Sequence, residues 1–221
     1  MAGQTLDTEH RMLIACVKTG TKYGPEYVRR LQAGVARHLP SRKDHEFVCF
    51  TDQAVEGVIC EQLPADLPGW WAKVGLFKLE RPLLYFDLDV VITGDLTPLL
   101  EWDRFGIIKD WWLPMFNSSV MRLTGNETHV WDAFAKDPMQ SMQLCRYGDQ
   151  EFVTRHMPDA RTFPRAWLPS YKADRCQAAP PKDALAVVFH GLPKPCQVGG
   201  WVAETWRGSQ AEPAPVAANS F

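Results

Sequence analysis

The sequence lacks the features that mark membrane, secreted or nucleic-acid-binding proteins. No apolar run approaches the roughly 20 residues of a transmembrane helix, and the first ten residues have no apolar core, which predicts a chain without a signal peptide. Its 24 basic and 26 acidic residues leave a net charge of −2, which gives no reason to expect nucleic acid as a partner. We expect no membrane span, and peripheral contact with a membrane stays open.

Closely spaced cysteines and glycine-rich loops are also missing. The six cysteines lie far apart and form no C-x-x-C pair, which predicts a reduced, cytoplasmic protein without a disulfide framework or a zinc site. The loop over residues 18–24 has neither a G-x-G-x-x-G pattern nor a P-loop. A dinucleotide or ATP site of those two types is therefore not expected.

Short apolar runs alternate with helical patterns along most of the chain. The strand-like runs are residues 11–17, 46–52, 58–60, 83–92, 105–109, 115–123 and 184–189, and the helical patterns are 25–39, 70–79, 127–135 and 148–157. This order favours an α/β fold with a mixed, mostly parallel central sheet and helices on both faces. We predict one domain over residues 1–207 and a flexible tail over 208–221.

Two aspartates follow the apolar start of the run 83–92. Because side chains alternate along an extended chain, Asp87 and Asp89 would face the same side, roughly 6–7 Å apart, within reach of one divalent cation. A buried carboxylate without a partner costs several kcal/mol, so the pair requires a cation or strong donors. In the alternative interpretation, one aspartate caps a turn and the other is solvated.

Other polar residues follow the predicted strands, and ligands collect at the carboxyl ends of strands in α/β sheets. Lys73 would pair with a phosphate or an aspartate, or be solvated. Residues 117–119, Asn-Ser-Ser, place hydrogen-bonding groups beside the same crevice or form a bulge. Asp149 begins a helix, where capping is the simple alternative. His190 and Lys194 follow the last strand, and prolines on both sides of Lys194 fix its backbone.

Taken in order, these motifs resemble the GT-A-fold glycosyltransferases, and most of all family 8, the glycogenin and galactosyltransferase-like enzymes. The resemblance covers about residues 11–200. It rests on YFDLD at 85–89, FNSSV at 116–120, GDQ at 148–150 and FHGLPKP at 189–195. The sequence departs from the family pattern at Glu151, where an aspartate is common, and at Cys196, where a tryptophan often follows the Lys-Pro pair.

The resemblance implies transfer of a sugar from a nucleotide diphosphate, usually a UDP-sugar, to a glycan or other hydroxyl acceptor, with retention of configuration. It also implies Mn²⁺, with Mg²⁺ as the alternative. The implied metal ligands are Asp87, Asp89 and His190. The implied donor-binding residues are Thr19, Tyr23, which would stack on the base, Lys73, Asn117 and Lys194, which would contact the diphosphate. The candidate catalytic residues are Asp149 and Gln150, and Trp111 or Trp112 would contact the acceptor.

Two other functions fit parts of the sequence. Residues 86–91 also resemble the nucleophile motif of haloacid-dehalogenase-like phosphatases, in which Asp87 would attack phosphorus and Asp89 would act as acid and base with Mg²⁺. That motif normally opens its domain, whereas here some 80 residues of α/β chain precede it. A catalytically silent sugar-nucleotide-binding protein would keep the same fold without turnover.

Overall fold

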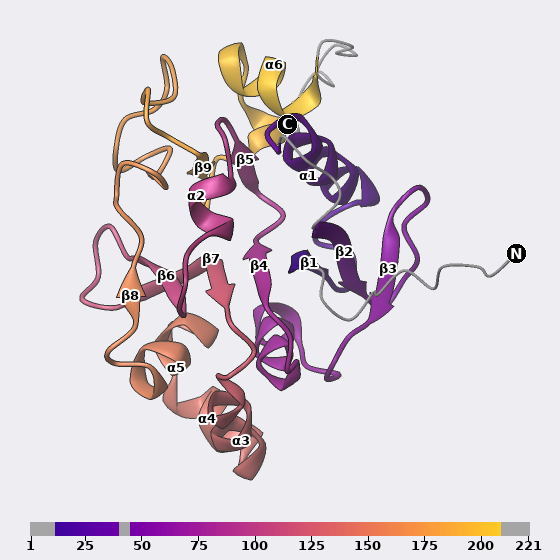
Figure 1. Cartoon of the computed structure of the whole chain (residues 1–221), viewed down its shortest axis with the longest axis vertical. Coiled ribbons are helices and arrows are strands. Elements are labelled where there is room, and N and C mark those ends of the chain that lie inside the picture. Colours follow the sequence, from indigo (N-terminus) through magenta and orange to yellow (C-terminus); the bar gives the residue numbers. More distant parts are fainter. Residues whose placement is uncertain (1–11, 40–44, 209–221) are drawn as a thin grey trace, which may run out of the picture.

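The computed structural model describes residues 12–39 and 45–208 of the chain. These residues form one central sheet, a second small sheet and a set of short helices (Figure 1). Most of the tail that the sequence predicts, residues 209–221, lies outside the described residues.

The central sheet has seven strands in the order β3-β2-β1-β4-β7-β6-β8. Their bounds are β1 (Met12–Lys18), β2 (His45–Thr51), β3 (Ile59–Gln62), β4 (Leu83–Phe86), β6 (Gly106–Lys109), β7 (Phe116–Leu123) and β8 (Arg161–Thr162). Strands β3, β2, β1 and β4 pair in parallel, as do β6 and β8, whereas β7 runs antiparallel to both of its neighbours. The prediction of a mixed, mostly parallel sheet is confirmed.

The apolar run 83–92 is not one continuous strand, contrary to the prediction from side-chain alternation. Strand β4 ends at Phe86, and β5 (Val90–Ile92) pairs antiparallel with β9 (Ala186–Val188) in a second, two-stranded sheet. Between them the backbone turns, with the N–H of Val90 donating to the carbonyl of Asp87 at 3.1 Å. Asp87 and Asp89 therefore lie on a turn between two sheets.

Helices cover both faces of the central sheet (Figure 1). They are α1 (Pro25–Arg37), η2 (Gly69–Lys78), α2 (Thr97–Leu100), α3 (Thr128–Lys136), α4 (Pro138–Leu144), α5 (Asp149–His156), η3 (Pro195–Gln197) and α6 (Gly200–Arg207). Helices α1 and α6 pack with β5 and β9 on one face, and η2, α3 and α5 pack on the other. The predicted helix at 70–79 is a 3₁₀ helix whose residues 71–77 are all buried, so tertiary packing on every side sets its geometry.

Strand β4 shows why the central run is apolar throughout. Leu84 and Phe86 belong to the core beneath α1, whereas Leu83 and Tyr85 belong to the core beneath η2 and α3. A strand buried on both faces gains from apolar residues at every position. The first polar side chain after β4, Asp87, therefore lies at the carboxyl end of a rigid, central strand.

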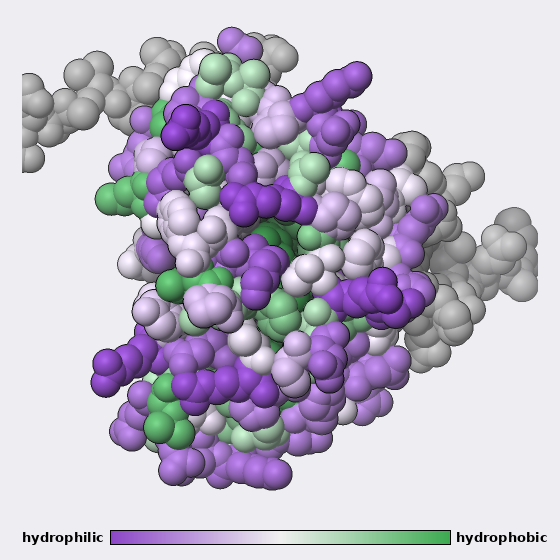
Figure 2. Space-filling model, turned by 90° about the vertical axis from the view of Figure 1, so that its left-hand side faces the viewer, coloured by the Kyte–Doolittle hydropathy of each residue, from purple (hydrophilic) through white to green (hydrophobic). Residues whose placement is uncertain are grey.

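The surface is mostly hydrophilic. On the side turned toward the viewer in Figure 2, apolar residues are confined to small patches and to a hollow near the centre. Among the described helices, none combines the length and the apolar character needed to cross a membrane.

Candidate functional site

One cavity of about 750 Å³ is lined by all the candidate metal-binding, donor-binding and catalytic residues, but not by Trp111 or Trp112, the candidates for acceptor binding. It lies at the carboxyl ends of β1 and β4. The segment that follows β9 and the first turn of α5 also line it. The candidate residues that line it are Thr19, Tyr23, Lys73, Asp87, Asp89, Asn117, Asp149, Gln150, His190 and Lys194. Convergence at the carboxyl ends of strands agrees with the position of ligand sites in α/β sheets.

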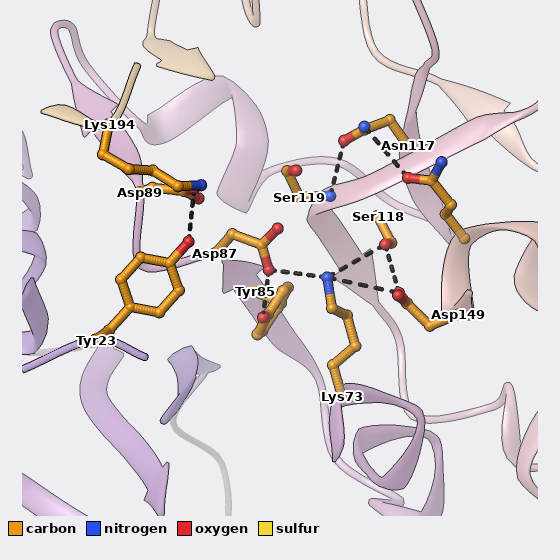
Figure 3. A network of polar contacts seen from close by, with 11 residues as sticks. Tyr23, Lys73, Tyr85, Asp87, Asp89, Asn117, Ser118, Ser119, Asp149 and Lys194 are labelled. Atoms are coloured by element: carbon orange, nitrogen blue, oxygen red, sulfur yellow. Dashed lines mark hydrogen bonds and ion pairs between the residues drawn. The ribbon is translucent and has the colours of Figure 1, made fainter. Parts of the chain in front are cut away.

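Asp87 is held by two donors that come from beneath the cavity. The ammonium group of Lys73 lies 2.9 Å from its Oδ1, and the hydroxyl of Tyr85 donates to the same oxygen at 2.7 Å (Figure 3). Burial alone would raise the pKa of Asp87, but the charge of Lys73 and these hydrogen bonds outweigh it and lower the pKa. Asp87 is therefore a fixed, ionised carboxylate.

Asp89 is held from the opposite wall of the cavity (Figure 3). The hydroxyl of Tyr23 donates to its Oδ2 at 2.8 Å, and the ammonium group of Lys194 contacts the same oxygen. Only 5% of Asp89 is exposed. Burial, followed by the charge of Asp87, raises the pKa of Asp89, while Lys194 and Tyr23 act in the opposite direction. The two aspartates thus have separate cations, rather than sharing one in the conformation described.

The cation beneath Asp87 also serves a third carboxylate. The Nζ of Lys73 lies 3.5 Å from Oδ2 of Asp149 and 3.3 Å from Oγ of Ser118, and the Ser118 hydroxyl donates to Asp149 at 2.5 Å (Figure 3). Burial raises the pKa of Asp149 although Lys73 and Ser118 favour its charged form. Asp149 is the first residue of α5, but the structure records no side-chain cap there. Its carboxylate belongs to the cavity network instead.

Asn117 and Gln150 lie side by side along the same wall. The amide nitrogen of Asn117 is 3.4 Å from Oε1 of Gln150, and the N–H of Ser119 donates to Oδ1 of Asn117 at 3.0 Å. Residues 117–119 are all buried in β7, so they are part of the strand. These amides offer donors and acceptors of fixed orientation, as recognition of sugar hydroxyls requires.

His190 lies in an aromatic enclosure at the edge of the cavity. Its ring stacks on Trp111, with centroids 4.9 Å apart, and meets Trp112 edge-on, and its Nε2 lies 2.7 Å from the hydroxyl oxygen of Ser170. Burial, together with the charge of Lys172, lowers the pKa of His190 to about 4. The imidazole is therefore neutral at physiological pH, which is the form that binds metals.

The chemistry of the predicted metal ligands suits a divalent cation. Two carboxylates and a neutral imidazole line one cavity, and like charges on Asp87 and Asp89 favour a cation between them. Within residues 12–39 and 45–208, however, no three His, Cys, Asp or Glu side chains already converge as a metal site. Metal binding by His190 at Nε2 would replace its contact with Ser170, and binding at Oδ2 of Asp89 would replace Lys194.

The sequence interpretation overlooked several residues of the cavity wall. Strand alternation predicts a place for Tyr85 in the site, because this residue precedes Asp87 by two positions and lies on the same side of the chain. Lys22, Arg146 and Tyr147 also line the cavity. No local pattern distinguishes these three residues from ordinary exposed loop residues.

No family model matches the sequence, and no curated protein is significantly similar to it. Among solved structures, the glycosyltransferase GlyE of Streptococcus pneumoniae TIGR4 is similar with a TM-score of 0.69 at 15% identity, covering 91% of this chain but only 61% of GlyE. The galactosyltransferase LgtC, in complex with donor and acceptor sugar analogues, gives 0.63 at 13% identity, covering 83% and 89%. Mouse xyloside xylosyltransferase 1 gives 0.53 at 15% identity, covering 82% and 97%. This chain has the GT-A fold.

Proposed function

We propose that this protein is a metal-dependent glycosyltransferase of the family-8 type, which moves a sugar from a UDP-sugar to a hydroxyl acceptor with retention of configuration. The observation that carries the proposal is the convergence of three separate motifs in one cavity of a GT-A fold. Asp87 and Asp89 follow β4, His190 and Lys194 follow β9, and Asp149 begins α5. The ammonium group of Lys194 suits a diphosphate. The fixed carboxylates and the neighbouring side-chain amides suit the sugar attached to it.

The diphosphate part of the donor would bind beside Asp89 and Lys194, which form an ion pair in the cavity wall. Asp87, Asp89 and His190 would hold Mn²⁺, or Mg²⁺ in its place, and the bound ion would stabilise the negative charge of the departing diphosphate. Lys194 would contact the same phosphates, because it lines the cavity and its ammonium group already contacts the predicted metal ligand Asp89. This pairing of a fixed cation with developing charge is electrostatic transition-state stabilisation.

The sugar part fits next to α5 and β7. Asn117 and Gln150 would bind sugar hydroxyls, and Asp149 would lie beside the reacting carbon. Ser118 and Lys73 hold the Asp149 carboxylate in one orientation, which is the requirement for a group that acts on a positioned substrate. We assign the catalytic roles to Asp149 and Gln150.

The base and the acceptor would occupy opposite ends of the cavity. Tyr23 presents an aromatic ring beside Lys194 on the first loop, where Thr19 also lines the cavity, so these residues would contact the base. Of the two tryptophans proposed for the acceptor, Trp111 is buried against His190, whereas Trp112 is 61% exposed. Trp112 is therefore the one with exposed ring surface that could stack on a sugar ring.

The test is a series of thermal shifts with UDP, GDP, ADP and CDP, each with and without Mn²⁺. A ligand that binds only the native state raises the melting temperature by mass action. We expect a Mn²⁺-dependent shift with UDP that is lost in Asp89→Asn and kept in Asp183→Asn, a matched change of an exposed aspartate outside the cavity. Release of UDP from a UDP-sugar then separates an enzyme from a silent binding protein.

The phosphatase alternative makes the opposite prediction. It requires no shift with any nucleoside diphosphate, together with Mg²⁺-dependent hydrolysis of p-nitrophenyl phosphate that Asp87→Asn abolishes. In the structure, Oδ1 of Asp87 accepts hydrogen bonds from Lys73 and Tyr85, which suits a carboxylate held for metal binding. That result would nevertheless replace the glycosyltransferase proposal.

A further inference from the structure

The ion pair between Lys194 and Asp89 lies in the wall of the cavity (Figure 3). The partners are 105 residues apart in the sequence, and their side chains are only 17% and 7% exposed. The Tyr23 hydroxyl donates to the same oxygen, Oδ2, at 2.8 Å. A protein cation and a phenol thus already occupy one of the two oxygens of a predicted metal ligand.

Backbone hydrogen bonds and two neighbouring prolines hold the chain at Lys194 in one conformation. Its N–H donates to Oε1 of Gln197 at 2.7 Å, and the N–H of Gln197 donates back to the Lys194 carbonyl at 2.9 Å. Pro193 and Pro195 restrict the chain on both sides, and the ammonium group lies 5.5 Å from the centre of the Tyr23 ring. The lysine is therefore held ready to pair with Asp89.

Other lysines of the cavity are not placed to do this. Lys73 has acceptors for its three N–H groups in Asp87, Ser118 and Asp149, so it is committed to the floor of the cavity. Lys22 is exposed, and its ammonium nitrogen lies 5.3 Å from the centre of the Tyr23 ring rather than against Asp89. Of these three lysines, Lys194 is the one that contacts Asp89, whereas Lys73 pairs with the other predicted aspartate ligand, Asp87.

We propose that Lys194 is an internal counter-cation that blocks metal binding at Asp89 until a nucleoside diphosphate draws the lysine away. The inference rests on the proposed function, since it requires both a metal and a diphosphate in this cavity. A divalent cation that binds Oδ2 of Asp89 must displace the ammonium group from that oxygen, and the displaced charge needs another anion. The diphosphate provides it, so metal and nucleotide bind cooperatively, each raising the affinity for the other by the same factor.

The experiment measures Mn²⁺ binding to the full chain by electron paramagnetic resonance of free Mn²⁺, with and without UDP. Wild type is compared with Lys194→Met and with Lys22→Met, which removes the same charge from the same cavity without touching Asp89. Tyr23→Phe is a milder second variant, because it removes only the hydroxyl donor from Oδ2. Thermal unfolding of each variant reports whether it is folded.

Wild type should bind Mn²⁺ weakly alone and much more tightly with UDP. Lys194→Met should bind Mn²⁺ alone about tenfold more tightly than wild type, since one charge-assisted hydrogen bond no longer competes for the carboxylate. The same variant should lose most of the enhancement by UDP. Tyr23→Phe should show a smaller gain, and Lys22→Met the smallest.

Two outcomes overturn the proposal in different ways. If Lys194→Met and Tyr23→Phe bind Mn²⁺ alone no more tightly than Lys22→Met, while wild type still binds Mn²⁺ and UDP cooperatively, the role of Lys194 is wrong and the proposed function stands. If wild type binds no Mn²⁺ even with UDP, the metal dependence in the proposed function fails as well.

Discussion

The ammonium group of Lys73 lies 3.5 Å from the carboxylate of Asp149 and 2.9 Å from that of Asp87, in the buried floor of the cavity. One cation therefore serves two carboxylates of different proposed roles, one in the metal motif and one next to the donor sugar. Burial works against the charged form of Lys73, but the charges of Asp149 and Asp87 raise its pKa nonetheless. This single side chain therefore links the two carboxylates.

Replacement of Lys73 by methionine should destabilise the protein by about 3 kcal/mol, because removal of one partner leaves buried charges uncompensated. The matched control is Lys78→Met on the same 3₁₀ helix, where the exposed lysine donates to the carbonyl of Pro64, and it should cost less than about 1 kcal/mol. Urea unfolding of both variants measures the difference. Equal losses would show that Lys73 is not the shared counter-charge of the site.

Asp149→Asn should stabilise the protein near neutral pH while abolishing sugar transfer. Burial raises the pKa of Asp149 in the folded state, so the folded protein holds its proton more tightly than the unfolded chain does. Stability from this group is then complete at pH values below the ordinary pKa of an aspartate and is lost as pH rises through the raised value. The melting temperature of Asp149→Asn should exceed that of wild type at about pH 7.5, and the two values should converge near pH 4. A variant less stable than wild type at pH 7.5 would contradict this sign.

His190 should make the protein less stable in mild acid. Its pKa in the folded state is lowered to about 4, so between the ordinary histidine pKa and that value the unfolded chain binds the extra proton and the folded protein does not. Stability from this group is present above the ordinary pKa and is lost as pH falls toward 4. Urea unfolding at several pH values should show that the free energy of unfolding falls less steeply with decreasing pH for His190→Asn than for wild type. His129→Asn, at an exposed helix position, is the control.

Gly191, which lines the cavity, and Gly148, whose chain neighbours line it, should respond very differently to replacement by alanine. Gly148 has φ 76° and ψ −151°, a region reserved for glycine, and a Cβ there would lie 2.4 Å from Nε1 of Trp70. Gly191 also has a positive φ, but its added Cβ would meet only the mobile end of Lys172 at 3.3 Å. We expect about 3 kcal/mol of destabilisation for Gly148→Ala and about 1 kcal/mol for Gly191→Ala. Chemical denaturation measures both costs, and similar values for the two variants would contradict the predicted clash with Trp70.

The sequence sufficed for the features that depend on local pattern. The apolar stretch before Asp87, the polar segment after residue 189 and the helix that begins at Asp149 each carry a chemical signature, and all three reach the same cavity. Helix α6 was missed although Val202 and Trp206 have helical spacing. Helix α4 has no buried residue, so it has no apolar periodicity by which to recognise it.

Features that depend on distant partners were not predictable in this way. The sequence at residues 87–89 is compatible with extended chain, so it predicts no turn. The turn follows from the pairing of Val90 with Val188, which no local pattern indicates. Likewise, the choice of Asp89 as the partner of Lys194 depends on a contact across 105 residues. Local pattern identified the charged groups, and only tertiary structure assigned their partners.

The pairing of β5 with β9 also sets the order in which the site can be completed during synthesis. Translation delivers Asp89 some hundred residues before Lys194, and β5 has no strand partner until residues 186–188 have emerged. In a nascent chain that stops short of β9, Asp89 has no Lys194 to pair with. The ion pair in the cavity wall therefore forms only after residue 194 has left the ribosome.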